Sequence, residues 1–386
     1  MTPVYLDYHA TTPVDPRVLD AMLPFFTERF GNPHSKQHAF GWDAKGATDV
    51  ARAQVAALIN AGAGEITFTG GATESSNLAL KGAVEARRGS GNHVVTVATE
   101  HKSVLDVCLQ FRAQGIDVTV VGVTPGGLVD LDVLRAALTP RTILVSVMAA
   151  NNEIGTIQPL AAIGAMVHEH GALLHTDAAQ AAGKIPIDVQ AMNIDLLSLT
   201  AHKFYGPKGC GALFVRRMKP RLHLAPQVAG GGQENGLRSG TLNVPGIVGL
   251  GRAAEICRLE MTAEAHRLSS LRDRLLAGLR AGLGDVRVNG CLEHRLPHNL
   301  HVGFDGVEGE ALLMALGDLA VSTGSACSSG SQAPSHVLQA IGATSQGAGA
   351  SIRFGLGRAT SDSDIDFAID RVTAVVTALR RQTTSA

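Results

Sequence analysis

The strongest constraint on the fold is an alternation of short apolar runs with helical stretches between about residues 50 and 215. The runs that read as buried strands lie at 94–98, 118–121, 143–148, 173–176, 196–199 and 212–215. Stretches with helical periodicity separate them, at 77–87, 104–114 and 160–170. Strands that alternate with helices form a mostly parallel sheet with helices on both faces. This part of the chain is therefore predicted to have an α/β fold.

The rest of the chain predicts a second, smaller unit. A long helical region at about 246–283 precedes short strands near 286–289, 299–304 and 352–354 and helices near 309–316 and 363–380. This mixed order is typical of an α+β domain. A chain of 386 residues has room for two or three domains. We expect a large domain at 13–258 and a small domain formed by 1–12 and 259–386.

Composition excludes several classes of protein. The 33 Lys and Arg against 34 Asp and Glu leave a net charge of −1, so no general attraction to nucleic acid or an anionic membrane is expected. No apolar run approaches the roughly 18 residues of a membrane span, and the N-terminus lacks the pattern of a secretory signal. The five cysteines are widely spaced and form no CxxC pair, which predicts reduced thiols in a cytoplasmic protein without a metal site.

The most informative chemical segment contains two apolar runs that are each followed by polar residues. Asp177 comes soon after the run at 172–174, and the run at 196–199 is predicted to be a buried strand that ends in the pair His202 and Lys203. Ligands bind at the carboxyl ends of strands in open α/β sheets. One interpretation is that Lys203 forms a Schiff base with pyridoxal phosphate while Asp177 pairs with the pyridinium nitrogen. The alternative is a solvated strand end and a helix-capping aspartate, and either residue alone favours that alternative.

A second candidate segment is TGGATES at residues 69–75, which follows the apolar residues 66–68 and precedes a helical stretch. A strand, a glycine-rich turn and a helix start expose backbone N–H groups that suit a phosphate. Thr73 adds a hydroxyl donor. The segment is neither a Walker A loop nor GxGxxG, so it indicates neither ATP nor a dinucleotide. An ordinary tight turn with a helix cap explains it equally well.

Ten motifs together resemble the cysteine desulfurases of the NifS/IscS type, which are class V aminotransferases of fold-type I. In order from residue 6 to 358 they are LDYHATTPVDPRV, FGNPHS, GGATESSN, TEHKSV, NNEIG, HTDAAQ, AHKFYGPKG, RSGTLNV, GSACSSGS and SIRFGLGR. The resemblance covers essentially the whole chain. It implies a large domain that binds pyridoxal 5′-phosphate and a small domain that carries a catalytic cysteine.

The resemblance also implies a role for each residue around the cofactor. Lys203 would carry the cofactor, and Asp177 would pair with its pyridinium nitrogen. His101 would stack on the ring and assist Lys203 in proton transfer, and Gln180 would donate to the phenolic oxygen. The implied phosphate contacts are Ala72, Thr73, Thr200 and His202. Thr200 stands where the family commonly has serine, so the hydroxyl is retained.

Substrate and subunit contacts follow from the same resemblance. Asn152 and Arg353 would bind the substrate carboxylate, a task that suits the planar fork of arginine. Thr241 would reach the phosphate of the neighbouring subunit, which implies an obligate homodimer.

One cysteine differs in its sequence surroundings. Cys327 lies in a polar loop of small residues, whereas Cys108 and Cys257 fall in helical patterns and Cys210 and Cys291 lie in turns beside glycines. In the family, the cysteine of this loop is the nucleophile that forms a persulfide. It could also contact an iron–sulfur cluster during transfer.

The implied activity is conversion of L-cysteine to L-alanine, with the sulfur held as an enzyme persulfide. The expected partner is an iron–sulfur scaffold or another sulfur-acceptor protein. A selenocysteine lyase and a related aminotransferase or lyase remain alternatives, because they would share Lys203 and Asp177. A catalytically idle scaffold protein is the alternative from a different class.

Overall fold

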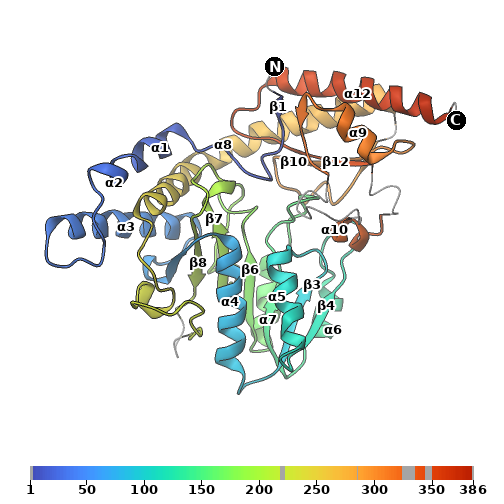
Figure 1. Cartoon of the computed structure of the whole chain (residues 1–386). Helices are drawn as coiled ribbons and strands as arrows, with labels where there is room; N and C mark the ends of the chain where they lie inside the picture. The colour runs from blue at the N-terminus through green and yellow to red at the C-terminus, as the bar shows by residue number, and fades with distance from the viewer. Residues whose placement is uncertain (1–2, 218–221, 285, 324–334, 344–349, 385–386) are drawn as a thin grey trace.

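A seven-stranded sheet forms the centre of the larger part of the molecule (Figure 1). The computed structural model describes residues 3–217, 222–284, 286–323, 335–343 and 350–384. From one edge to the other the strands are β2 (Ile66–Thr69), β8 (Gly211–Val215), β7 (Leu196–Thr200), β6 (Leu173–Asp177), β5 (Thr142–Ser146), β3 (His93–Val97) and β4 (Asp117–Val121). Strands β7 to β4 run parallel, and β8 is antiparallel to both of its neighbours. The prediction of a mostly parallel sheet is confirmed.

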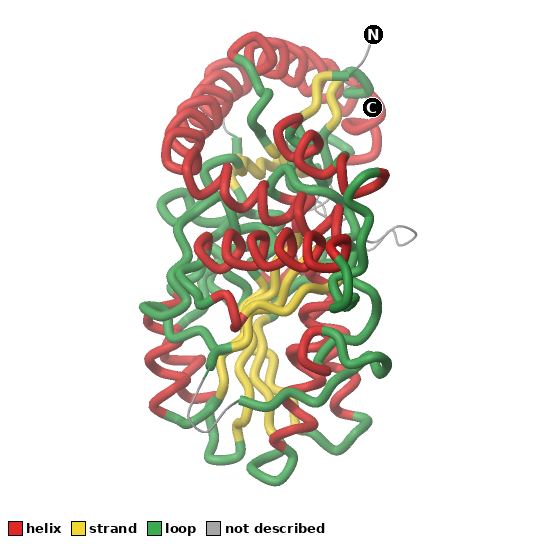
Figure 2. Tube along the Cα trace, turned by 90° about the vertical axis from the view of Figure 1, so that its left-hand side faces the viewer, coloured by secondary structure: helices red, strands yellow, loops and turns green. Residues whose placement is uncertain are grey.

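Helices cover both faces of this sheet, as Figure 2 shows. The helices of this larger unit are α1 (Pro16–Met22), α2 (Pro24–Thr27), α3 (Ala39–Leu58), α4 (Ala72–Arg87), α5 (Lys102–Arg112), α6 (Leu131–Ala137) and α7 (Leu160–Glu169), of which α1 and α2 pack on α8 (Val244–Leu283). Successive strand residues point to opposite faces. Val94 therefore packs in the core that contains residues of α4 and α5, whereas Val95 packs in the core that contains residues of α3 and α7. Burial on both faces explains why the inner strands read as continuous apolar runs.

The smaller unit has two short sheets and its own core. Its antiparallel sheet is β12 (Ser351–Gly355), β10 (Asn299–Gly303) and β9 (Arg287–Val288), and β1 (Val4–Tyr5) pairs with β11 (Leu319–Ala320). Its helices are α9 (Gly309–Ala315), α10 (His336–Ala340) and α12 (Asp362–Thr384). Phe304 and Phe354 are fully buried in the core of this unit. The fold class, with a smaller α+β unit beside the large sheet, is confirmed.

Helix α8 (Val244–Leu283) links the two units, and its 40 residues run through the predicted boundary at 258/259 without a break. It contacts α3 near its start and α12 nearer its end (Figure 1). The predicted domain limits stay a prediction. Nowhere in the described ranges is a helix both long enough and apolar enough to cross a bilayer.

The N-terminal segment holds the two units together beside the carboxyl ends of the parallel strands. The backbone N–H of Tyr8 donates to the carbonyl of Gly355 in β12 at 3.1 Å. The N–H of Thr12 donates to the carbonyl of His202, just after β7, at 2.9 Å. Residues 8–12 therefore pass directly along the sheet edge at which a ligand is expected.

Candidate active site

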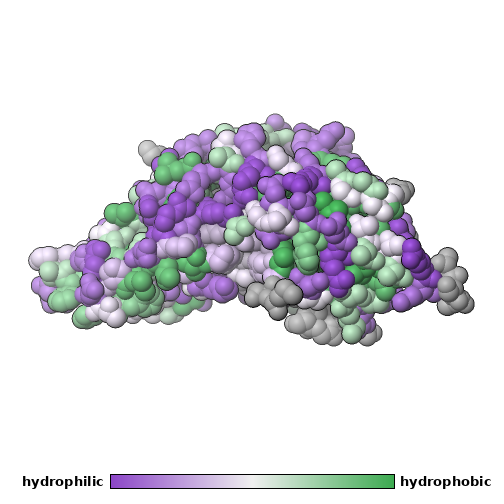
Figure 3. Space-filling model, turned by 90° about the horizontal axis from the view of Figure 1, so that it is seen from above, coloured by the Kyte–Doolittle hydropathy of each residue, from purple (hydrophilic) through white to green (hydrophobic). Residues whose placement is uncertain are grey.

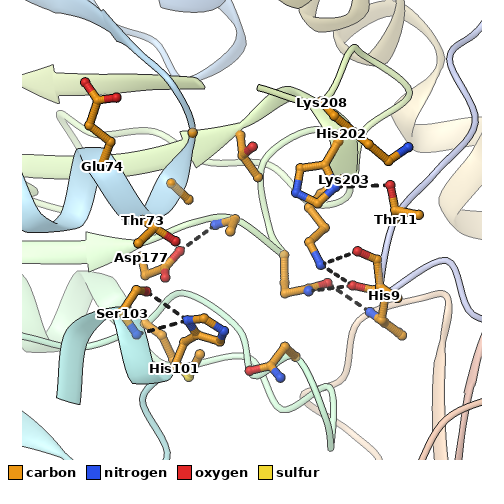
Figure 4. A pocket seen from close by; sticks show the side chains of 18 of the residues that line it. His9, Thr11, Thr73, Glu74, His101, Ser103, Asp177, His202, Lys203 and Lys208 are labelled. Carbon is orange, nitrogen blue, oxygen red and sulfur yellow. Dashed lines mark hydrogen bonds between the residues drawn. The ribbon is translucent and has the colours of Figure 1, made fainter. Parts of the chain in front are cut away.

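A cavity of about 930 Å³ opens at this sheet edge (Figure 4). It is formed by the N-terminal segment, the start of α4 and the turns after β6 and β7. The sequence-predicted site residues that line it are Ala72, Thr73, His101, Asn152, Asp177, Gln180, Thr200, His202, Lys203 and Arg353. Residues from six separate motifs therefore meet in one place.

Lys203 lies one short turn beyond the end of strand β7. The turn is a 3₁₀ helix at Ala201–Lys203, so the lysine follows the strand and does not end it as predicted. Its Nζ donates to the carbonyls of His9 and Ala10, the latter at 2.8 Å (Figure 4). Lys208 also lines the cavity but is exposed. The amino group of Lys203 is thus held at the inner wall, and that of Lys208 lies on an exposed side chain.

Asp177 ends strand β6 and is only 5% exposed. Its Oδ1 accepts a hydrogen bond from the backbone N–H of Ala179 at 2.9 Å. Burial raises the pKa of Asp177, while this hydrogen bond and the charges of His101 and Lys203 oppose the rise. A cation bound against the carboxylate would favour its ionised form. The Asp177 side of the cavity therefore suits a positively charged group.

His101 caps the N-terminus of α5 and faces the same cavity (Figure 4). Its Nδ1 accepts from the backbone N–H of Ser103 at 3.2 Å and lies 2.8 Å from the Ser103 hydroxyl. A neutral His101 that accepts at Nδ1 carries its proton on Nε2. Burial is the largest cause of the lowered pKa of His101. The ring is therefore a mainly neutral group with a defined tautomer.

The start of α4 has features that suit an anion. Gly71 precedes the helix with φ of 147°, a backbone conformation that side chains rarely adopt. The first N–H groups of a helix have no partner within it and favour negative charge. Thr73, Thr200 and His202 line the cavity beside them. Burial, with help from Lys203 and Lys208, lowers the pKa of His202 to about 4, so its neutral ring offers hydrogen bonds without a charge.

Arg353 enters the cavity from β12 of the smaller unit and is 2% exposed. Its Nη1 donates to the carbonyl of Asn152 at 2.9 Å, and its Nη2 donates to Asp7 Oδ1 at 2.8 Å. Its Nε is buried without a hydrogen-bond partner. Asp7 was not predicted from the sequence, because 346 residues separate it from Arg353. A substrate carboxylate at Arg353 would therefore compete with Asp7.

One predicted site residue, Thr241, is exposed and does not line this cavity. Another, Cys327, lies outside the described residues. The four described cysteines, Cys108, Cys210, Cys257 and Cys291, do not line it either. Burial raises the pKa of Cys108 and of Cys210 to about 12, so neither thiol ionises near neutral pH.

The described residues fit pyridoxal 5′-phosphate on the chemistry of their donors. The start of α4 with Thr73 suits the phosphate, and the buried carboxylate of Asp177 suits the pyridinium nitrogen. The amino group of Lys203 lines the same cavity. A phosphate site, a buried anion and a lysine in a single cavity are the three features that this cofactor requires.

Sequence reasoning also missed Glu153, a buried carboxyl close to the cavity. Its Oε2 accepts from the hydroxyl of Ser335 at 2.5 Å, and Ser335 caps helix α10. Burial raises the pKa of Glu153 to about 7, against the opposing effects of Ser335 and Arg353. The contact joins the loop after β5 to α10 across 182 residues, so no local pattern could reveal it.

Replacing Glu153 with glutamine is expected to change how stability depends on pH. The folded-state pKa near 7 exceeds the ordinary value of 4.5. Protonated Glu153 therefore contributes stability below about pH 4.5, and this contribution is lost as the pH rises through 7. The free energy of unfolding should fall by about 3 kcal/mol over this range, because each unit of difference between the two pKa values corresponds to ~1.4 kcal/mol. Melting curves should show the Tm of Glu153→Gln, relative to wild type, rising between pH 5 and 8. A Tm difference between the two proteins that does not change with pH would contradict a raised pKa for Glu153.

Comparisons with known proteins agree with this geometry. The aminotransferase class-V family matches residues 4–367. The chain is 57% identical to the cysteine desulfurase IscS of Anaeromyxobacter sp. (strain K) over 95% of this chain and 91% of that protein. It is 56% identical to the cysteine desulfurase IscS of Methylococcus capsulatus, over 98% of this chain and 93% of that protein.

A solved structure described as a NifS-like protein superposes with a TM-score of 0.91 at 38% identity. The match covers 98% of this chain and 100% of that one. Proteins of this family depend on pyridoxal 5′-phosphate, in agreement with the donors that line the cavity. The chain belongs to the aminotransferase class-V family and, within it, to the cysteine desulfurases of the NifS/IscS type.

Proposed function

We propose that this protein is a pyridoxal-phosphate-dependent cysteine desulfurase that converts L-cysteine to L-alanine and retains the sulfur on Cys327. The observation that carries the proposal is the meeting of Lys203, Asp177 and Arg353 in one cavity. A cofactor lysine, a buried carboxylate and a carboxylate-binding arginine are the groups that an amino-acid enzyme of this kind needs. The names of the relatives, at 56–57% identity, support cysteine as the amino acid.

Each predicted site residue in the cavity then has a chemical task. When bound, pyridoxal 5′-phosphate supplies an electron sink that stabilises negative charge on the substrate Cα. Arg353 and Asn152 hold the substrate carboxylate, and Arg353 exchanges its contact with Asp7 for that carboxylate. Lys203 Nζ removes the Cα proton as a general base, and His101 Nε2 assists in moving it. Asp177, Gln180, Thr200, His202, Ala72 and Thr73 hold the cofactor.

The sulfur-transfer step needs a thiolate on the enzyme. The Cys327 thiolate attacks the substrate sulfur, and an S–S bond forms while the Cβ–S bond breaks. The electron pair of the broken bond remains with Cβ, which takes up a proton as alanine forms. Cys327 is left as a persulfide that passes its outer sulfur to an acceptor protein.

One panel of assays tests this function against its alternatives. Purified protein is expected to release alanine from L-cysteine and, with a reductant, an equal amount of sulfide. A much faster reaction with selenocysteine would instead indicate a selenocysteine lyase. Amino transfer to a keto acid without release of sulfide would indicate an aminotransferase. No reaction with any of these substrates would indicate a catalytically idle scaffold.

The destination of the sulfur is proposed to be an iron–sulfur scaffold protein, as the resemblance of the sequence motifs implies, or another sulfur acceptor. A cytoplasmic location is proposed because the five cysteines are widely spaced and form no CxxC pair, as expected for reduced thiols. Transfer of ³⁵S from the enzyme to a purified scaffold would test the partner directly.

A homodimer is part of the same proposal. Large apolar side chains are exposed along α1 to α3, at Leu19, Leu23, Phe26, Phe30, Phe40 and Trp42. Hydrophobic surface also appears on the left in Figure 3, on the side where Figure 1 places these helices. Contiguous exposed apolar surface of this kind marks protein–protein contacts. A second copy of the chain is the occupant that also explains an exposed Thr241 outside its own cavity.

Mixing two inactive variants should restore part of the activity if Thr241 completes the partner's phosphate site. Lys203→Ala and Thr241→Ala protomers that exchange subunits would form some cavities with both residues intact. We expect mixed dimers to regain up to about one active site in two, because each complete site needs one residue from each subunit. Alanine release before and after exchange measures this. Absence of recovery in verified mixed dimers, or a monomer in analytical ultracentrifugation, would contradict the proposal.

A further inference from the structure

We infer that a buried hydrogen-bond relay, Arg295–Asn299–His9–Gln180, orients the Gln180 amide so that its NH₂ group is available to the cofactor. The inference rests on the proposed cofactor site. It makes His9 and Asn299 positioning residues for the reaction. All four side chains are at most 7% exposed. The contacts join the smaller unit, the N-terminal segment and the turn after β6.

The first step is the orientation of Asn299, at the start of β10. Its Oδ1 accepts from Arg295 Nη1 at 2.8 Å, and a guanidinium can only donate. Its Nδ2 donates to the carbonyl of Glu153 at 3.0 Å, and a carbonyl can only accept. Each of these two partners by itself allows only one orientation of the Asn299 amide, and both require the same one. The second hydrogen on Nδ2 must then point to its other neighbour, His9 Nε2, at 3.0 Å.

The second step is the tautomer of His9. Because Asn299 donates to Nε2, that nitrogen must be the acceptor, and the proton of the neutral ring lies on Nδ1. Nδ1 is 2.9 Å from Gln180 Oε1, to which it donates. Complete burial, and next the charge of Arg353, lower the pKa of His9 well below its usual value, with smaller contributions from Lys203 and Lys184. A second proton would also oppose the N–H of Asn299, so the ring stays neutral.

The third step is the Gln180 amide. With Oε1 bound by His9 Nδ1–H, Nε2 donates one hydrogen to the carbonyl of His9 at 3.1 Å. An amide NH₂ has two donors, and Gln180 lines the cavity. One N–H is therefore left to stabilise negative charge on a bound ligand. If the amide rotated by 180°, Oε1 would face the carbonyl of His9 and Nε2 would face Nδ1–H.

The His9→Leu variant tests the relay because it removes both ring contacts with little change in size. A hydrogen bond from Gln180 would stabilise negative charge on the phenolic oxygen of the cofactor. That oxygen would then attract the proton on the neighbouring Lys203 Nζ less strongly. Loss of the Gln180 hydrogen bond should therefore raise the pH midpoint of the visible absorption of the holoenzyme by about one unit, the effect of one hydrogen bond to a charged group. Cofactor affinity, measured by equilibrium dialysis, should fall about tenfold. Neither readout requires turnover, so both are independent of the proposed desulfurase activity.

His301→Leu is the matched control. His301 lies two residues beyond Asn299 in β10, is fully buried, and bonds Asn289 instead of the relay. The control should leave the absorption midpoint within about 0.2 units of wild type, because it removes a buried histidine without changing Gln180. An unchanged midpoint in cofactor-loaded His9→Leu would overturn the inference. Equal shifts in the two variants would also overturn it.

The tautomer of His9 provides a test in the wild-type enzyme, even if His9→Leu fails to fold. Long-range ¹H–¹⁵N correlation spectra of holoenzyme labelled with ¹⁵N-histidine distinguish a proton on Nδ1 from one on Nε2. The signals of His9 can be assigned by their loss in His9→Asn, a smaller polar replacement. A neutral ring protonated on Nδ1 is expected. A proton on Nε2 would reverse the relay and refute the assigned orientation of Gln180.

Discussion

Replacing Lys203 with alanine is expected to reduce alanine production from L-cysteine by about 10³-fold or more while the protein stays folded. Proton transfer by a positioned side chain alone contributes about 10²–10⁴-fold, and Lys203 is also the proposed anchor of the cofactor. The side chain is half-buried, and its Nζ donates to the backbone carbonyls of His9 and Ala10. Alanine release and the visible spectrum after borohydride reduction measure the two effects separately.

Lys208→Ala is the matched control for this prediction. Lys208 lines the same cavity five residues further along the chain, but it is exposed. Its variant should keep a cofactor that borohydride fixes covalently and should retain measurable turnover. Normal turnover by Lys203→Ala, together with an inactive Lys208→Ala, would show that the lysine has been assigned wrongly.

Much of the large unit could be predicted because its signals are local. Each inner strand is buried on both faces and therefore reads as an apolar run; β5 and β6 are examples. The ends of the predicted strands differ from those observed by at most two residues. The position of Lys203 was less accurate, because a single 3₁₀ turn separates it from β7 and leaves no periodic pattern.

In the candidate site, too, features encoded by neighbouring residues could be predicted, whereas contacts between distant residues could not. The motifs named most of the residues that line the cavity, because each short motif carries its own chemistry. They could not reveal the ion pair between Asp7 and Arg353 or the contact between His9 and Asn299, whose partners lie 346 and 290 residues apart. Such contacts depend on how the smaller unit packs against the large sheet. These long-range contacts set the orientation of each site side chain and therefore the donor or acceptor that it turns to the ligand. The type of a residue alone does not determine that orientation.

Replacing Cys327 with serine is expected to separate desulfurase chemistry from every other activity of a pyridoxal-phosphate enzyme. Binding of cofactor and removal of the Cα proton depend on Lys203 and Asp177, and neither needs a thiol. Sulfur abstraction does need one, because a serine hydroxyl without an activating base is a weak nucleophile. Cys327→Ser should therefore bind the cofactor and change its spectrum with L-cysteine, while alanine production falls by about 10³-fold or more, as after removal of a reacting group.

The position of the transferred sulfur decides the assignment. Intact-protein mass spectrometry of the wild type after L-cysteine should show one added sulfur that a reductant removes, and peptide mapping should locate it on Cys327. Cys108 and Cys210 are poor competitors because burial raises the pKa of each to about 12 and keeps the thiol protonated. Burial raises the pKa of Cys257 as well. A persulfide on Cys291 or on any of these three, or full alanine production by Cys327→Ser, would refute the role of Cys327 even if the cofactor chemistry at Lys203 were correct.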